Sequence, residues 1–195
     1  MTKICFIRHG ETDWNIAGKL QGRTDIPLNE SGIKQAQACG VSLLQNEWDL
    51  IITSPLLRAK ETGKIIQQKL NIPLHEMTSF IEVAFGDAEG LTYYERDVRF
   101  PNRDYPNKET EAMVTERFLK GIRTVHQNYT NKNILIVSHG AFINAIFHYF
   151  SNGTVGTGVT RLTNGSFSTL EINNNHTHIL DYNTTHHLPA QNPKS

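Results

Sequence analysis

Residues 4–10 of the chain are Ile-Cys-Phe-Ile-Arg-His-Gly, a short apolar run that ends abruptly in charged and polar side chains. Leu-Ile-Ile-Thr at 50–53 and Ile-Leu-Ile-Val at 134–137 are also followed at once by polar residues. Continuous runs of branched apolar residues are typical of strands that are buried on both faces of a parallel sheet. The three runs therefore predict the centre of such a sheet.

A helical pattern follows each of these runs. After the first, Asn29 and Ser31 are capping candidates, and apolar residues then recur at helical spacing. Further helices are predicted over 59–70, from about Thr110 and from Gly140, while residues 165–172 and 176–182 form an expected edge hairpin. Strands that alternate with helices predict an α/β fold with three layers, α/β/α, around a mostly parallel sheet.

Length and charge limit the kinds of partner. The chain has 195 residues, 38% of them hydrophobic, which favours a single domain over 1–195 with 184–195 as a loose tail. Nineteen Lys and Arg balance nineteen Asp and Glu, so no basic excess favours nucleic acid or a membrane surface. No apolar stretch is long enough to span a bilayer or to act as a secretion signal, which predicts a cytoplasmic protein. Monomer and homodimer both stay open.

Residues 89–108 have an unusual density of aromatic and guanidinium groups that neither strand nor helix periodicity explains. We expect this irregular stretch to be a small cap loop over the carboxyl ends of the strands, on the substrate side. A solvated surface excursion is the alternative.

The residues that follow the predicted strands point to phosphate chemistry. In an open α/β sheet, ligands bind beyond the carboxyl ends of the strands, where Arg8, His9, Arg58 and His139 would converge. The planar fork of arginine matches a phosphate, and a neutral imidazole can attack phosphorus and form a covalent intermediate. The pattern predicts phosphoryl transfer.

A covalent route also needs an acid for the leaving oxygen. Glu82 is our candidate because it ends a short apolar run just before the irregular stretch, and Asp87 and Glu89 compete with it. The chain has no Gly-x4-Gly-Lys loop, which excludes a P-loop phosphate site. Neither cysteine is followed by an arginine at the sixth position, which excludes a cysteine phosphatase. No His-rich spacing supports a metal site.

These residues resemble the histidine phosphatase superfamily, also called phosphoglycerate mutase-like. The motifs occur in the family's order, from Arg-His-Gly-Glu-Thr at 8–12 through Trp14-Asn15 and Gln-Gly-Arg at 21–23 to Ser-His-Gly at 138–140. The resemblance runs from residue 3 to about 172. Two departures lie beside the expected substrate pocket: Ala88 stands where many members have Trp, and Pro-Asn-Lys-Glu-Thr at 106–110 replaces Pro-Gly-Gly-Glu-Ser.

The resemblance implies a role for each site residue. His9 would be the nucleophile that forms a phosphohistidine, and Glu82 the proton donor. Arg8, Arg58 and Asn15 would bind the phosphoryl group together with His139, which also counts among the catalytic residues, and no metal is expected. For the rest of the substrate we predict six contacts: Gln21, Gly22, Arg23, Tyr93, Arg96 and Arg99.

Three functions follow from this pattern. The first is a phosphomonoester hydrolase that acts on a small phosphorylated metabolite without a cofactor; it is favoured because a small cap excludes water poorly. The second is a phosphoglycerate mutase that depends on 2,3-bisphosphoglycerate. The third is a non-catalytic module that binds a phosphorylated ligand, although such a module needs neither nucleophile nor acid.

Overall fold

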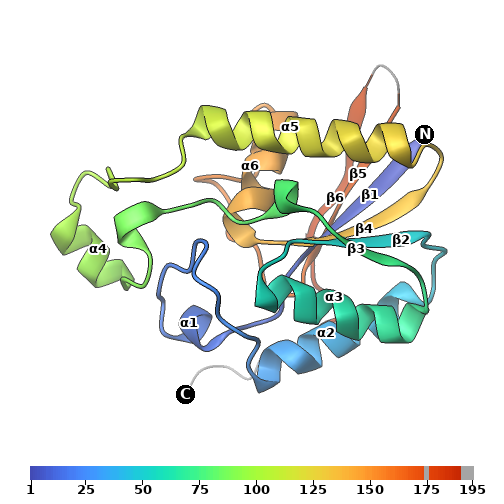
Figure 1. Cartoon of the computed structure of the whole chain (residues 1–195), viewed down its shortest axis with the longest axis horizontal. Coiled ribbons are helices and arrows are strands. Elements are labelled where there is room, and N and C mark those ends of the chain that lie inside the picture. Colours follow the sequence, from blue (N-terminus) through green and yellow to red (C-terminus); the bar gives the residue numbers. More distant parts are fainter. Residues whose placement is uncertain (174–175, 190–195) are drawn as a thin grey trace.

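The computed structural model describes residues 1–173 and 176–189. Within these residues one sheet has the strand order β3-β2-β4-β1-β5-β6 (Figure 1). Its strands are β1 (Thr2–Arg8), β2 (Leu50–Thr53), β3 (Leu74–Glu76), β4 (Asn133–Ser138), β5 (Phe167–Ile172) and β6 (Thr177–Thr184). The first four are parallel, and the hairpin of β5 and β6 is antiparallel. The predicted mostly parallel sheet with an edge hairpin is confirmed.

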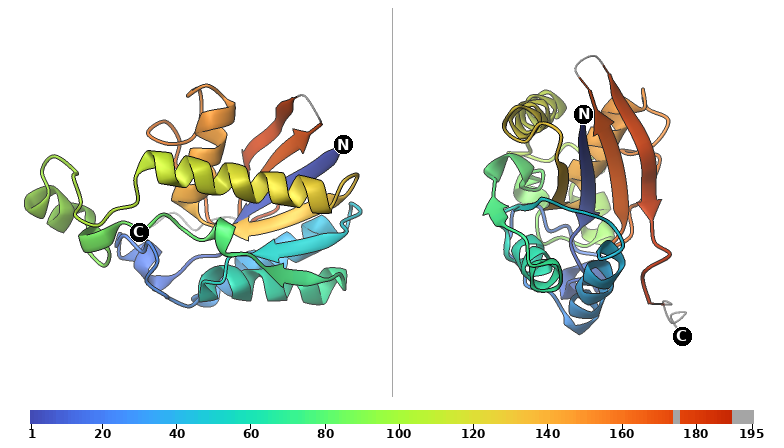
Figure 2. Two further views of the ribbon diagram at one scale, coloured as in Figure 1. Left: turned by 45° about the horizontal axis from the view of Figure 1, so that its top comes forward. Right: turned by 90° about the vertical axis from the view of Figure 1, so that its right-hand side faces the viewer.

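Helices cover both faces of the sheet, which gives the predicted three layers (Figure 2). One face packs against α2 (Glu30–Leu43) and α3 (Leu57–Leu70), and the other against α5 (Glu111–Asn128) and α6 (Gly140–Phe150). Successive side chains of β1 alternate between the two cores, since strand side chains point to opposite faces.

Polar side chains set the starts of these helices. Asn29 caps α2 by accepting a hydrogen bond from the Gly32 amide, and Thr110 caps α5 in the same way through Met113. Both capping residues lie at predicted helix starts. The inner face of α6 is formed by Phe142, Ile143, Ile146 and Phe147.

The predicted cap stretch over 89–108 is not irregular throughout, because it contains a helix, α4 (Tyr93–Arg99). Its start is a capping box, in which the side chain of Thr92 accepts from the Glu95 amide and the side chain of Glu95 accepts from the Thr92 amide. Two backbone bonds join Leu20 to Gly90 and Leu91, which fastens this cap to the loop after α1 (Asp13–Ile16). Short 3-10 turns, η1 (Thr78–Phe80) and η2 (Gly86–Ala88), precede α4.

The segment after β6 also differs from the prediction of a loose tail. The His187 ring stacks on Phe167 with 3.9 Å between ring centroids, and its Nε2 lies 3.0 Å from the Gly165 carbonyl oxygen. Leu188 packs on the core beside α2. The predicted tail beyond residue 189 lies outside the described residues. None of the helices in the described part of the chain is long and apolar enough to cross a membrane.

Candidate active site

A cavity of about 230 Å³ lies at the carboxyl ends of the parallel strands. It is lined by nine of the predicted site residues: Arg8, His9, Asn15, Gln21, Gly22, Arg58, Glu82, Tyr93 and Arg96. His139 is not among the lining residues, but its ring centroid lies 5.2 Å from that of His9. The structure therefore brings together all the side chains predicted for the reacting centre.

His9 follows directly after β1 and is 2% exposed. Its Nδ1 lies 2.7 Å from the carbonyl oxygen of Gly10, which can only accept, so we assign the ring proton to Nδ1. The lone pair is then on Nε2. Burial, and next the charges of Arg58 and Arg8, lower the pKa of His9 well below its ordinary value. The imidazole is therefore neutral at neutral pH, as a nucleophile must be.

The backbone around His9 is fixed by its neighbours. The Gly10 amide donates to Thr62 Oγ1 at 3.1 Å, and the Asn164 side chain donates to the His9 carbonyl at 3.0 Å. Gly10 approaches α2 so closely that a side chain would not fit: an added Cβ would lie 2.4 Å from the Gly32 carbonyl oxygen. These contacts hold the imidazole at the end of β1.

Two arginines, the buried Arg58 and the half-buried Arg8, supply positive charge. Arg58, near the start of α3, donates to the carbonyl oxygens of Thr24 and Gly22 at 2.9 and 2.6 Å, while Arg8 donates to that of Leu162. Burial lowers the pKa of Arg8 to about 10, so this guanidinium stays charged at neutral pH. Within the described residues neither forms an ion pair, and the Nε of each has no hydrogen-bond partner. Two guanidinium groups that converge on one cavity without an ion-pair partner favour an anionic ligand.

Hydrogen bonds restrict the orientations of two further polar side chains of the site, His139 and Asn15. His139 Nε2 lies 2.7 Å from Ser54 Oγ, and its buried Nδ1 has no partner in the described part of the chain. Burial and the charge of Arg58 lower the pKa of His139 well below its ordinary value. The Asn15 oxygen accepts from Thr12 and Asn164, which leaves its amide NH₂ group for a ligand.

Glu82 is the one predicted acid that lines the cavity among the described residues. Its carboxyl oxygens accept from the amides of Val83 and Phe142 at 2.9 Å and of Ala141 at 3.2 Å. Burial raises its pKa and outweighs these hydrogen bonds, which favour the carboxylate. Two amides of the α6 N-terminus, those of Ala141 and Phe142, are thus occupied by Glu82.

The competing acids have other partners. Glu89 accepts from the backbone amides of Arg23, Thr24 and Phe85, so it holds two loops together. Asp87 is exposed and accepts from the Asn107 side chain at 3.1 Å.

The outer rim of the cavity differs in part from the prediction. Arg96 stacks over Tyr93 of α4 at 4.5 Å, as a lining pair. Neither Arg23 nor Arg99 is among the lining residues, since Arg23 pairs with Glu109 at 3.1 Å and Arg99 lies over Phe100. Sequence reasoning missed three polar lining residues: Lys19, Asn144 and Arg161.

One of these three had a usable signal. Asn144 lies one turn into α6, where it is polar among the apolar residues from Phe142 to Phe147. Lys19 and Arg161 are in loops with no periodicity. For metals, no cluster of three or more His, Cys, Asp or Glu side chains occurs within residues 1–173 and 176–189.

Comparisons with known proteins agree with this geometry. The chain is 46% identical over 188 residues to the uncharacterized phosphatase PhoE of Bacillus subtilis, covering 96% of this chain and 97% of that protein. It is 29% identical to the metal-independent phosphoserine phosphatase of Arabidopsis thaliana, covering 75% and 68%.

Among solved structures, YhfR of Bacillus stearothermophilus superposes with a TM-score of 0.89 at 25% identity, covering 97% of this chain and all of that one. A phosphoserine phosphatase mutant from Entamoeba histolytica in complex with phosphoserine gives 0.83 at 29% identity, covering 97% and 100%. The family model of the histidine phosphatase superfamily (branch 1) matches residues 4–185, and the chain belongs to this family.

Proposed function

We propose that the protein is a metal-independent phosphomonoester hydrolase that acts on a small phosphorylated metabolite through a phosphohistidine at His9. The observation that carries this proposal is the state of the His9 ring. Its Nδ1 is engaged with the Gly10 carbonyl, and it lies in one cavity with the guanidinium groups of Arg8 and Arg58, neither of which forms an ion pair among the described residues. A fixed neutral nucleophile beside these two positive charges suits attack on a phosphate dianion.

In the first step the Nε2 lone pair of His9 attacks phosphorus and the bond from phosphorus to the ester oxygen breaks. Arg8 and Arg58 stabilise the charge on the equatorial oxygens, together with Asn15 and His139. The protonated carboxyl of Glu82 gives its proton to the leaving oxygen, so the alcohol departs neutral.

In the second step water attacks the phosphohistidine. The Glu82 carboxylate takes a proton from this water as its oxygen bonds to phosphorus, and the bond to Nε2 breaks. The products are inorganic phosphate and free His9, with Glu82 protonated again. Burial raises the pKa of Glu82, which favours the protonated form that the first step needs, and the second step restores this form.

The rest of the substrate contacts the rim in this proposal. Gln21 and Gly22 line one side of the cavity, and Tyr93 with Arg96 of α4 lines another. Lys19 and Arg161 add two further cations at the mouth. A metabolite that carries a second polar or anionic group beyond its phosphate suits this rim.

A mutase is the second candidate. Among the relatives is the 2,3-bisphosphoglycerate-dependent phosphoglycerate mutase 2 of Gloeobacter violaceus, 28% identical over 162 residues. The cationic rim would suit a small phosphorylated acid, but a mutase must also exclude water from its phosphoenzyme. Tyr93, at the mouth of the cavity, is 56% exposed, which favours hydrolysis.

A panel of phosphate esters tests these functions. Release of inorganic phosphate from aryl and metabolite esters supports the hydrolase. Steady interconversion of 2- and 3-phosphoglycerate that depends on the bisphosphate, without net phosphate release, would support the mutase instead. Tight phosphate binding without any turnover would support the non-catalytic module. A cytoplasmic location and a monomeric or homodimeric state stay predictions.

A further inference from the structure

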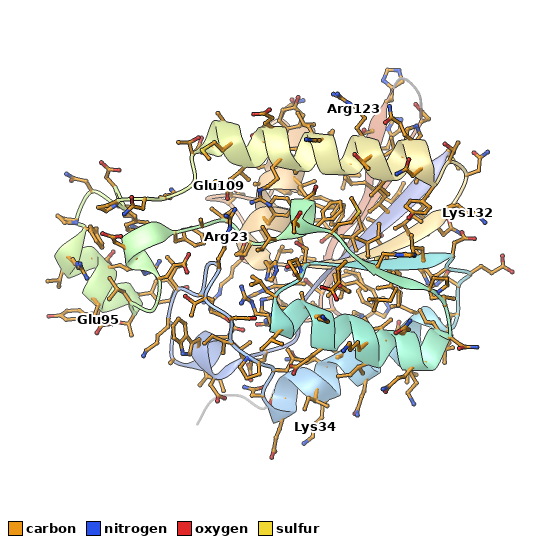
Figure 3. The ribbon with its side chains drawn as sticks, viewed as in Figure 1. Arg23, Lys34, Glu95, Glu109, Arg123 and Lys132 are labelled. Carbon is orange, nitrogen blue, oxygen red and sulfur yellow. The ribbon has the colours of Figure 1, made fainter. Side chains whose placement is uncertain are left out.

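An ionic cluster around the buried Glu109 lies close to the proposed acid but outside the cavity. Glu109, whose side chain is 6% exposed, precedes α5 and accepts two hydrogen bonds of 2.9 Å from Arg117. It also accepts from Arg23 at 3.1 Å and from the Ala84 amide at 3.2 Å, and its own amide donates to the Ala84 carbonyl. Figure 3 labels Arg23 and Glu109, which lie side by side near the start of α5.

The two arginines of this cluster bind the backbone that carries Glu82. Arg117 donates to the carbonyl oxygens of Ser79 at 3.1 Å and of Ile81 at 2.8 Å. The carbonyl oxygen of Glu82 itself accepts from Arg23 Nε at 3.2 Å and from Arg117 Nη2 at 3.4 Å. The chain between η1 and η2 has no strand or helix bonds of its own, so these contacts replace them.

Arg117 also contacts the residue that holds the Glu82 carboxyl group. Its guanidinium lies 4.3 Å from the ring centre of Phe142, and the Phe142 amide donates to Glu82 at 2.9 Å. One side chain therefore touches both the backbone of Glu82 and the α6 residue to which its carboxyl is bound.

The charges of the cluster are costly unless they are paired. Burial opposes ionisation of Glu109, but the hydrogen bonds and charge of Arg117 outweigh it, and the pKa of Glu109 is lowered. Buried ion pairs contribute little net stability compared with apolar residues of similar size. A purely structural role would therefore not require this arrangement.

We propose that Glu109, Arg117 and Arg23 are positioning residues that hold the general acid Glu82 at the distance required for proton transfer to the leaving group. This inference rests on the proposed function. None of the three lines the reaction cavity, so each acts through the segment that carries Glu82. General acid catalysis needs hydrogen-bond distance to the leaving oxygen, so a small displacement of this segment lowers the rate.

Four variants test the proposal. Arg117→Lys keeps the charge but removes the planar fork, Glu109→Gln keeps the shape but removes the charge, and Arg23→Lys perturbs the partly exposed member in case the buried variants fold poorly. The control is Lys132→Met, which breaks a surface pair with Asp49. Thermal unfolding and circular dichroism establish that each variant is folded.

The readout is the dependence of kcat/KM on the leaving group. For alkyl or phenyl phosphate, whose leaving oxygens need a proton, we expect about a tenfold loss in Arg117→Lys and in Glu109→Gln, and a smaller loss in Arg23→Lys. For p-nitrophenyl phosphate, whose nitrophenolate group leaves without a proton, the loss of kcat/KM is expected to stay below about twofold. Lys132→Met should not alter kcat/KM for either class of ester.

Combination with Glu82→Gln shows whether the cluster acts through the acid. In that background Arg117→Lys is expected to cause no further loss, because the group that it positions is already absent. An equal loss for both classes of ester, or a full additional loss in the double variant, would overturn the proposal. If instead Glu82→Gln alone were insensitive to the leaving group, the assignment of the acid in the proposed function would fail, which is a separate result.

Discussion

The floor and the rim of the cavity are built in different ways. On the floor, His9, His139 and Arg58 are buried at the ends of β1 and β4 and at the start of α3, and each has a fixed hydrogen-bond partner. On the rim, Tyr93 and Arg161 are exposed and come from a short helix and a loop. In the proposed function the floor is therefore preorganised for one tetrahedral anion, whereas the exposed rim contacts the rest of a substrate.

This contrast assigns the chemistry and the selectivity to separate regions. Changes on the floor should lower the turnover of every phosphate ester, because the transferred group is always the same. Changes on the rim should alter the ranking of esters and leave the simplest ones almost untouched.

The largest effect is expected for His9→Ala. Without the nucleophile, kcat/KM for every ester should fall by about 10⁴-fold or more, since removal of a covalent nucleophile leaves only binding and electrostatic contributions. Steady-state assays with an aryl phosphate measure the loss. The exposed His75→Ala is the matched control and should keep full activity. Substantial turnover in His9→Ala would break the distinction between floor and rim.

Glu82→Gln comes next in size. We expect kcat/KM to fall by about 10²- to 10³-fold for esters with poor leaving groups and far less for good ones, because only the former need a proton from the acid. A Brønsted plot of rate against leaving-group pKa should become steeper. Asp87→Asn, an exposed carboxylate nearby, is the control. An unchanged slope would remove Glu82 from the role of acid.

The rim variants sharpen the comparison. Arg96→Ala and Arg161→Ala should lower kcat/KM by about five- to tenfold for metabolite esters with a second anionic group, since each of these arginines provides one charge-assisted contact. Aryl phosphate hydrolysis should change by less than about twofold. Arg99→Ala, on α4 but outside the cavity lining, serves as the control. Equal losses for both ester classes would mean that these arginines act on the transferred phosphoryl group and not on the rest of the substrate.

A change of pH is expected to alter kcat/KM less, by several-fold. Burial keeps the pKa of His9 well below 6.5, so the reactive neutral form is already complete at neutral pH and is lost only on strong acidification. The pKa of Glu82 is raised, so its active protonated form is lost as the pH rises through that value.

The optimum of kcat/KM should consequently lie on the acid side of neutrality. The fall toward alkaline pH should disappear in Glu82→Gln. An alkaline optimum, or the same alkaline fall in that variant, would contradict these two shifts.

The smallest effect is expected for a chelator. Incubation with EDTA followed by gel filtration should leave kcat and KM unchanged, because the positive charge of the floor comes from Arg8 and Arg58. Added Mg²⁺ or Zn²⁺ should not increase activity. Loss of activity that a metal ion restores would contradict the metal-independent mechanism.

The same contrast explains what could be predicted from the sequence. The floor residues Arg8, His9 and His139 directly follow apolar runs, and the geometry of a parallel sheet brings such positions together. Position and resemblance favour Glu82 as the acid, but only the hydrogen bonds in the structure distinguish it from Glu89. Where long-range order follows from regular elements, prediction succeeded.

The remaining features depend on long-range side-chain contacts that hydrophobic periodicity in the sequence does not predict. Arg161 reaches the cavity from the loop between α6 and β5, and Arg23 turns to Glu109 because a buried carboxylate competes for it. His187 docks on Phe167, although its neighbourhood is polar in sequence. The helix α4 did have a local signal, the spacing of Thr92 and Glu95 typical of a capping box, and this signal was overlooked.

The phosphoenzyme provides the most direct test of the central claim. Wild-type protein and Glu82→Gln would be quenched in alkali during turnover of an aryl phosphate, digested, and analysed by mass spectrometry for the peptide that carries the phosphoryl group. The account predicts one phosphoryl group on His9, more abundant in Glu82→Gln when its hydrolysis is slowed, and absent from His9→Ala. Turnover without label on His9, or label on another residue such as His139, would contradict it.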